Sequence, residues 1–135
     1  MITAVDTNVL LDVFSADETY GPRSRSALEQ SLQDGALVVS DAVWAETVAA
    51  FPDPEAAVKA FARLGAGFSP PTQETAVRAG AAWRAYRSAG GPRTRVVADF
   101  LIGAHALVQA DRLLTRDRGF YRKYFTELTV LDPSA

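Results

Sequence analysis

Hydrophobic residues along the chain form four short continuous runs, separated by longer segments in which they recur every three or four positions. A short continuous run is typical of a strand buried on both faces, and the longer period is typical of a helix. Strands that alternate with helices usually form a parallel sheet. The sequence therefore predicts an α/β fold, a three-layer α/β/α sandwich with a central parallel sheet. The predicted strands are residues 2–5, 36–39, 113–115 and 128–131.

Capping residues and helix breakers set the expected limits of the helices. Ser40 and Thr72 are suitable N-caps, and Gly35 can end a helix. The segment 67–71, GFSPP, is expected to be a turn. A first helix is expected after a tight turn that follows the first strand at Asp6. The other expected helices span 20–33, 41–51, 53–64, 73–88 and 96–110, with a helical turn within 116–123. In the helix over 53–64 we expect the inward side chains to be Val58, Phe61, Ala62 and Leu64.

The segment 96–110, VVADFLIGAHALVQA, contains a single charged residue, Asp99. It is too short and too polar to cross a membrane, so we interpret it as a buried helix that carries one carboxylate. An unpaired ionised carboxylate is costly in such surroundings. Asp99 is therefore expected to have a partner, either a cationic side chain or a metal ion.

The composition limits the domain count and the kinds of site. A chain of 135 residues, 48% of them hydrophobic, is long enough for one buried core, so residues 1–135 are expected to form a single domain. The absence of Cys excludes disulfides, thiolate metal sites and a Cys nucleophile, which leaves oxygen ligands and one His for any metal. The N-terminus lacks the basic residues of a secretory signal, and we expect a cytoplasmic protein.

Charge is distributed unevenly along the chain, although the net charge is only −2. Residues 1–77 contain 4 basic and 11 acidic side chains, whereas residues 78–123 contain 10 basic and 3 acidic ones. Of the 14 basic residues, 12 are Arg, whose planar guanidinium suits phosphate groups. The basic segment is either a phosphate-binding surface or a solvated face paired with the acidic half.

Four acids occupy positions where a shared site is expected. Asp6 follows the first predicted strand and Asp117 follows the third, and the carboxyl ends of parallel strands meet at one edge of the sheet. Glu46 and Asp99 are lone charges in apolar helices. If the four converge, a divalent cation such as Mg²⁺ would offset their repulsion. Such a site is suited to metal-dependent hydrolysis of phosphodiesters.

Each of these acids also has a purely structural interpretation. Asp6 could cap the helix that follows it, Glu46 could reach solvent at the helix edge, Asp117 could be a turn acid, and Asp99 could be an N-terminal helix acid. Asp12, Asp41 and Asp111 are interpreted as surface or helix-start acids, with Asp41 the substitute if Glu46 fails. His105 is interpreted as a core or solvent-edge residue rather than a ligand.

Four segments together resemble the PIN-domain nucleases, and within them the VapC-type toxins of bacterial toxin–antitoxin pairs. The segments are AVDTNVLLD (4–12), SDAVWAET (40–47), RVVADFLIGAHAL (95–107) and LLTRDRGFYRKY (113–124). The resemblance covers essentially the whole chain, and the first and last segments are the most specific. It implies an α/β/α sandwich in which the four acids bind Mg²⁺ or Mn²⁺ and RNA is cleaved.

The resemblance also implies supporting residues and partners. Asn8 and Thr115 match positions that support the acidic site. The family usually forms homodimers and is silenced by an antitoxin whose C-terminal segment blocks the site, and residues 43–64 are the expected contact surface. The basic segment would hold RNA phosphates, and the candidate RNA-binding residues are Arg93, Arg95, Arg116 and Arg118.

Three other classes of protein compete with a nuclease. A haloacid-dehalogenase-like phosphatase requires a second acid two residues after the first, where this chain has Asn8. A receiver-type signalling domain requires paired acids and a supporting Lys, and the only lysines are Lys59 and Lys123. A PIN fold that only binds RNA or protein would not need all four acids.

Overall fold

Five parallel strands form the centre of the molecule. The structure is a computed structural model that describes all residues, 1–135. The strand order is β3-β2-β1-β4-β5, with every neighbouring pair parallel, which confirms the predicted α/β class and sheet. The strands are β1 (Ile2–Val5), β2 (Ala36–Val39), β3 (Gly67–Phe68), β4 (Arg112–Leu114) and β5 (Val130–Leu131).

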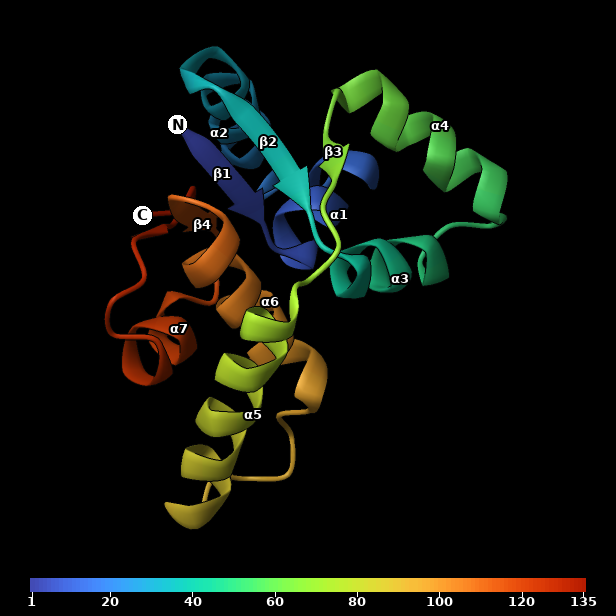
Figure 1. Cartoon of the computed structure of the whole chain (residues 1–135). Helices are drawn as coiled ribbons and strands as arrows, with labels where there is room; N and C mark the ends of the chain where they lie inside the picture. Colours follow the sequence, from blue (N-terminus) through green and yellow to red (C-terminus); the bar gives the residue numbers. More distant parts are fainter.

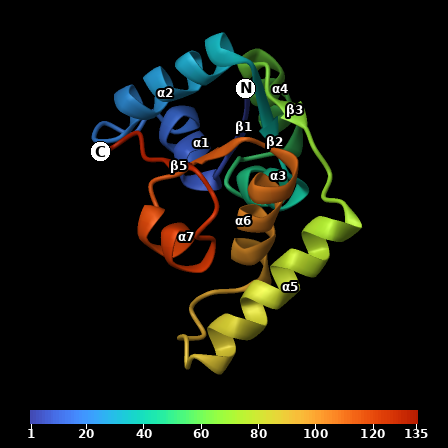
Figure 2. The same ribbon diagram turned by 60° about the vertical axis from the view of Figure 1, so that its left-hand side comes forward.

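Seven helices surround the sheet. Helices α1 and α2 contact each other and α2 lies against β1 and β2, whereas α6 lies against β1 and β4 with α5 beside it, which gives the three layers (Figure 2). Figure 1 shows α4 beside β3 and α5 projecting from the other end of the molecule. None of the helices is both long and apolar enough to cross a membrane. The helices are α1 (Thr7–Phe14), α2 (Gly21–Asp34), α3 (Asp41–Ala49), α4 (Pro54–Leu64), α5 (Gln73–Ser88), α6 (Val97–Gln109) and α7 (Arg118–Tyr124).

Strand β1 lies in the middle of the sheet and determines its register. Ala4 is opposite Val38 of β2 and Leu113 of β4, and Ala4, Val5 and Leu113 are all buried. A strand covered on both faces needs apolar residues at consecutive positions. The continuous runs at 2–5, 36–39 and 113–115 therefore correspond to β1, β2 and β4, whereas only the last two residues of the run at 128–131 form a strand, and Leu131 is exposed.

Several predicted helix ends agree with the capping geometry. The Asp53 carboxylate accepts a hydrogen bond from the Ala56 amide at 2.9 Å, and the Thr72 hydroxyl accepts one from the Thr75 amide. Gly65 ends α4 with φ of 80°, a left-handed conformation that favours Gly. Ser40 precedes α3 as expected, but its hydroxyl makes no capping hydrogen bond.

Three expectations about the same region were wrong. Val58 is 53% exposed and Ala62 is also exposed, because the buried face of α4 is formed by Ala57 and Phe61. The segment expected to be only a turn contains β3. This strand has two residues, both exposed, and therefore leaves no hydrophobic signal in the sequence.

Helix α6 is the most deeply buried helix beside the sheet, with Phe100, Ile102, Gly103, Ala104, His105 and Ala106 all buried. The Phe100 ring packs edge to face against Phe120 with centroids 5.3 Å apart. Gly103 lies against the Phe125 ring, where a Cβ atom would come within 2.5 Å of a ring carbon. Close approach of α6 to this aromatic cluster therefore requires a residue without a side chain.

Candidate active site

The carboxyl ends of β1 and β4 are adjacent, and both lead into predicted site residues. Asp6 lies between β1 and α1, and Asp117 lies between β4 and α7. Glu46 comes to this edge from α3 and Asp99 from the first turn of α6. The topology therefore brings four elements, separated by up to about a hundred residues of sequence, to one edge of the sheet.

Asp6 is the most deeply buried of the four acids, with 7% of its surface exposed. Its carboxylate accepts hydrogen bonds from the Thr7 amide at 2.7 Å, the Thr115 hydroxyl at 2.8 Å and the Asn8 side-chain amide at 3.3 Å. Burial raises the pKa of Asp6 to about 6, while the bonds from Thr115 and Thr7 lower it and Glu46 raises it further. Asp6 is therefore a carboxylate held by neutral donors, without a cation.

Asn8 and Thr115 join the two strand ends that carry the acids. Besides contacting Asp6, the Asn8 side chain accepts a hydrogen bond from the Arg116 amide at 3.1 Å. The Thr115 hydroxyl, besides donating to Asp6, accepts a hydrogen bond from the Asp117 amide at 3.0 Å. Both residues therefore lie between Asp6 and the segment that carries Asp117.

Glu46 reaches the site from an exposed position. Its Oε1 accepts a hydrogen bond from the Thr7 hydroxyl at 2.7 Å, and it contributes to the raised pKa of Asp6. The expectation that Glu46 is a lone charge in a buried helix was wrong, because the buried residues of α3 are Val43 and Thr47. The Glu46 side chain lies on the solvent-exposed face of α3, so its charge pays no burial cost that a cationic partner would have to offset.

Asp99 also occupies a different environment from the one expected. Helix α6 begins at Val97, so Asp99 lies in its first turn and is only partly buried. Its Oδ2 accepts a hydrogen bond from the Val96 amide at 3.1 Å, which is the N-terminal helix role left open by the sequence. The prediction of a carboxylate inside a buried helix was therefore wrong, although the helix itself is buried.

Tyr121 belongs to this region and was not identified from the sequence. The residue is 1% exposed, and burial raises the pKa of its hydroxyl well above 10, with Asp6, Asp99 and Asp117 adding to the effect. Tyr121 is therefore close enough to these three acids for their charge to affect its hydroxyl. A weak signal existed, because Tyr121 follows Asp117 by four residues, one turn of a helix.

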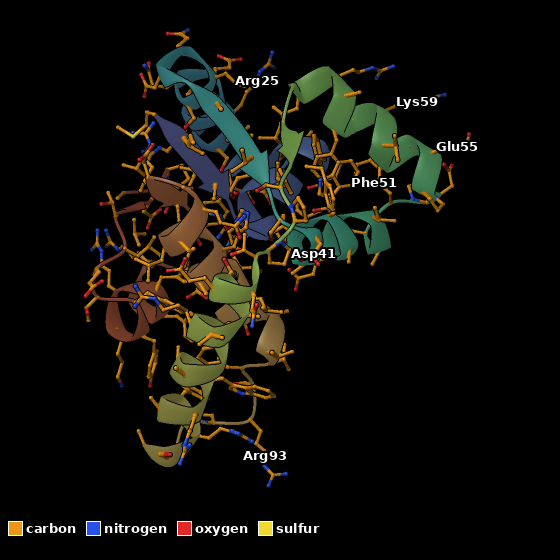
Figure 3. The ribbon with its side chains drawn as sticks, in the orientation of Figure 1. Arg25, Asp41, Phe51, Glu55, Lys59 and Arg93 are labelled. Atoms are coloured by element: carbon orange, nitrogen blue, oxygen red, sulfur yellow. The ribbon has the colours of Figure 1, made fainter.

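The predicted RNA-binding arginines lie in different environments. Arg116 forms a bidentate ion pair with Asp12, at 2.7 and 2.9 Å, so its guanidinium already has a carboxylate partner. Asp12 is 4% exposed, which corrects its interpretation as a surface or helix-start acid. Arg118 lies 3.6 Å from Asp132 and remains half exposed. Arg93 is exposed and points away from the body of the protein (Figure 3).

The remaining candidates do not join the acidic site. Asp41 is exposed at the start of α3, and Asp111 accepts a hydrogen bond from the Ile2 amide at 2.6 Å. His105 is 1% exposed and its Nε2 lies 2.9 Å from the Ser69 hydroxyl. Burial lowers the pKa of His105, as expected for a neutral core histidine. The interpretation of His105 as a core residue rather than a ligand agrees with this position.

The donor chemistry of the edge suits a hard divalent cation. Asp6, Glu46, Asp99 and Asp117 offer carboxylate oxygens, which Mg²⁺ and Mn²⁺ prefer, and buried Asp6 has no cation to offset its charge. In this arrangement no three acidic or His side chains are close enough to hold a metal ion together. Asp117 is instead paired with Arg95, whose Nη1 lies 2.6 Å from Oδ2. The residues fit a metal in kind, and binding one would require them to move closer.

A second feature lies on another face of the molecule. A groove of about 740 Å³ runs between α1, α2 and α4, and eight of its twelve lining residues are hydrophobic. Its apolar lining includes Phe14, Leu28 and Phe51. The side chains of Arg25 and Lys59 lie on either side of it (Figure 3). Arg63 adds a third cation to the lining.

Comparison with known proteins gives one family and a group of similar structures. The PIN domain family model matches residues 3–126. VapBC2 from Rickettsia felis bound to a promoter DNA fragment has a chain with TM-score 0.76 and 17% identity, covering 98% of each chain. VapBC-1 from nontypeable Haemophilus influenzae has a chain with TM-score 0.74 and 22% identity, covering 100% of each chain. A toxin–antitoxin complex from Klebsiella pneumoniae has a chain with TM-score 0.70 and 22% identity, covering 97% of each chain. No curated protein matches the sequence.

Proposed function

The chain belongs to the PIN domain family, and from this premise we propose that it is the toxin of a toxin–antitoxin pair, a metal-dependent endoribonuclease. The observation that carries the proposal is the Asp6 carboxylate, buried without a cation and held in place by Thr115 and Asn8. Perturbed carboxylates of this kind are concentrated at functional sites. The match of the PIN family model over residues 3–126 argues against the phosphatase and receiver alternatives, and Asn8 occupies the position where such a phosphatase requires a second acid.

The proposed metal ligands are Asp6, Glu46, Asp99 and Asp117. A bound Mg²⁺ or Mn²⁺ would lower the pKa of a water molecule and stabilise charge on the phosphodiester. Thr115 and Asn8 orient the Asp6 carboxylate, and the Thr7 hydroxyl holds Glu46 beside it. These hydrogen bonds reduce the freedom of the acids before any substrate binds.

The basic segment is the proposed RNA-binding surface. Arg93 and Arg118 are both exposed near the ends of the elements that carry Asp99 and Asp117. Phosphate contacts of this kind bind the backbone of RNA without reading its sequence. Arg116 contributes indirectly, because its pairing with Asp12 and its amide bond to Asn8 fix the segment that leads to Asp117.

The proposed antitoxin site is the groove between α1, α2 and α4. Three of the similar structures are complexes that include an antitoxin or a VapB–VapC pair. The groove combines an apolar floor with Lys59 and Arg63, while Arg25 in its lining is paired with Glu29, so it has a net positive charge and suits an amphipathic segment with acidic side chains at its edges. This location includes part of the predicted surface 43–64 and adds α1 and α2. The homodimer and the cytoplasmic location stay predictions.

The test is cleavage of structured and unstructured RNA by purified protein with Mg²⁺, Mn²⁺ or EDTA. Wild type is compared with Asp99→Asn and with Glu55→Gln, which removes an exposed acid from α4, away from the site (Figure 3). We expect metal-dependent cleavage by wild type and Glu55→Gln and none by Asp99→Asn. Equal cleavage by wild type and Asp99→Asn would remove Asp99 from the site. RNA binding without cleavage by any variant would indicate a binding-only PIN domain.

A further inference from the structure

One of the five ion pairs in the structure involves a proposed metal ligand. Arg95 Nη1 lies 2.6 Å from Asp117 Oδ2, and Arg95 Nη2 lies 3.3 Å from Asp117 Oδ1. Both carboxylate oxygens of Asp117 therefore accept hydrogen bonds from one guanidinium. A bidentate pair of this kind is more directional than contact with a single ammonium group.

The surroundings of Arg95 hold its guanidinium at this position. Its Cζ lies 4.2 Å from the centre of the Phe120 ring, within the range of a cation–π contact. The loop that carries Arg95 is anchored by a hydrogen bond from the Tyr86 hydroxyl to the Pro92 carbonyl. Gly91 packs against the Tyr86 ring so closely that a Cβ atom would come within 2.5 Å of it. An anchored loop therefore presents Arg95 to Asp117.

The pairing leaves few free ligands at the acidic edge. Arg95 engages both oxygens of Asp117, and the Val96 amide donates to one oxygen of Asp99. The pKa of Arg95 is raised mainly by its hydrogen bond to Asp117, with Asp99 also contributing. A divalent cation requires carboxylate oxygens that are not already shared with another positive charge. This is consistent with the absence of a preformed group of three acids.

We propose that Arg95 is an internal counter-ion of the acidic site, which competes with a divalent cation for Asp117 and is released when the metal binds. This inference rests on the proposed metal-dependent function. While the metal is absent, Arg95 offsets the charge of Asp117 and limits repulsion among the acids. Once released, its guanidinium remains on a loop beside the site, where its shape suits an RNA phosphate. Arg95 is thus a positioning residue in one state and a substrate-binding residue in the other.

The experiment is a calorimetric titration of metal-free protein with MnCl₂ at low ionic strength. The variant is Arg95→Gln, and the matched control is Arg93→Gln, which removes the same charge from the same loop at an exposed site that points away from the body (Figure 3). We expect Arg95→Gln to bind Mn²⁺ roughly two- to fivefold more tightly than wild type, since a partly exposed pair contributes up to about fivefold. Arg93→Gln is expected to change the dissociation constant by less than about twofold.

A double variant identifies the carboxylate that is freed. In an Asp117→Asn background, the substitution Arg95→Gln is expected to give no gain in Mn²⁺ affinity. Equal affinity for Arg95→Gln and Arg93→Gln, or a gain that persists without Asp117, would overturn the proposal while leaving the metal site intact. Absence of Mn²⁺ binding in every folded variant, confirmed by circular dichroism, would overturn both this inference and the metal dependence of the proposed function.

Discussion

Two buried acids of one helical segment, Asp6 and Asp12, have opposite environments in the fold. Asp6 precedes α1 and Asp12 lies within it, and they are 7% and 4% exposed. Asp12 has a cation, because Arg116 pairs with it in bidentate fashion and the Ser24 hydroxyl donates to it at 2.8 Å. Asp6 receives hydrogen bonds only from neutral groups, and its pKa is raised to about 6.

The presence or absence of a cationic partner distinguishes an acid that stabilises the fold from an acid that is suited to bind a ligand. A buried carboxylate with its own Arg is already neutralised and has little tendency to bind another cation. A buried carboxylate without one is a source of instability that persists where a function requires it. Burial alone therefore does not identify the site; burial without a counter-ion does.

The largest effect on stability is expected from Asp12→Asn. This substitution leaves the Arg116 guanidinium, 24% exposed, without its carboxylate. Removing one partner of a largely buried pair should lower the free energy of unfolding by roughly 2–3 kcal/mol. The measurement is urea denaturation at pH 7.5. A loss below about 0.5 kcal/mol would show that the pair behaves as a surface ion pair.

A double-mutant cycle tests whether the loss comes from the pair itself. Arg116→Gln alone should also destabilise the protein, because it leaves Asp12 buried and charged. Combining Arg116→Gln with Asp12→Asn should cost less than the sum of the two single changes. Additive losses would show that the two side chains act independently.

Asp6→Asn is expected to raise the free energy of unfolding, which is the opposite of the effect expected for Asp12→Asn. The raised pKa of Asp6 means that its charged form destabilises the folded state by up to about 3 kcal/mol at neutral pH. Part of this gain is lost, because Asn replaces one of the two accepting oxygens with an NH₂ group, which cannot accept the hydrogen bonds that Asp6 Oδ2 receives from Thr115 and Asn8. We expect the metal-free variant to be more stable by roughly 1–2 kcal/mol in urea denaturation. A variant less stable than wild type would contradict the contrast with Asp12.

The pH dependence of the same pair of proteins gives a further test. The folded pKa of Asp6, about 6, lies above its usual 3.8, so the folded state binds more protons than the unfolded state between these values. The stability of wild type relative to Asp6→Asn should therefore fall as pH rises from about 4 to about 6, and level off above that. His105 is present in both proteins and cancels in this difference. A difference that is constant with pH would place the pKa of Asp6 at its ordinary value.

The smallest effect on stability is expected at Glu46, which is exposed. Glu46→Gln should change the free energy of unfolding by less than about 0.5 kcal/mol, like the exposed control Glu55→Gln. The two variants should differ in RNA cleavage, because only Glu46 lies at the acidic edge, beside Thr7. Measuring thermal unfolding and cleavage together distinguishes them. Equal cleavage by both variants would show that Glu46 is only a surface acid.

The sequence predicted most of the fold because the signals are local. Strands β1 and β2 have the expected limits, and the cap at Thr72 lies where predicted, since short apolar runs and capping residues act over a few positions. Strand β3 was missed because it has two exposed residues. The outward position of Val58 was missed because α4 packs on a narrow face around Phe61.

The sequence was enough to propose which acids form the site, but not to predict which arginines pair with acidic side chains there. Asp6 and Asp117 follow strands in the sequence, so their convergence follows from a parallel sheet. The pairing of Arg95 with Asp117 and that of Arg116 with Asp12 depend on how distant loops meet, which no local pattern specifies. The environment of Asp99 was misjudged although α6 begins within one residue of the predicted start, because Val96 and Val97 beside it are apolar but exposed and the buried part of the helix begins at Phe100.

The most direct test of the central claim is thermal unfolding of wild type, Asp6→Asn and Glu55→Gln, each with and without millimolar MnCl₂. If Asp6 is a buried ligand without its own cation, Mn²⁺ should raise the melting temperature of wild type and Glu55→Gln and have little effect on Asp6→Asn. The increase in melting temperature should therefore be larger in the two proteins that keep the Asp6 carboxylate than in Asp6→Asn. An equal response of all three proteins to Mn²⁺, or no response by wild type, would contradict the claim that Asp6 belongs to a metal site.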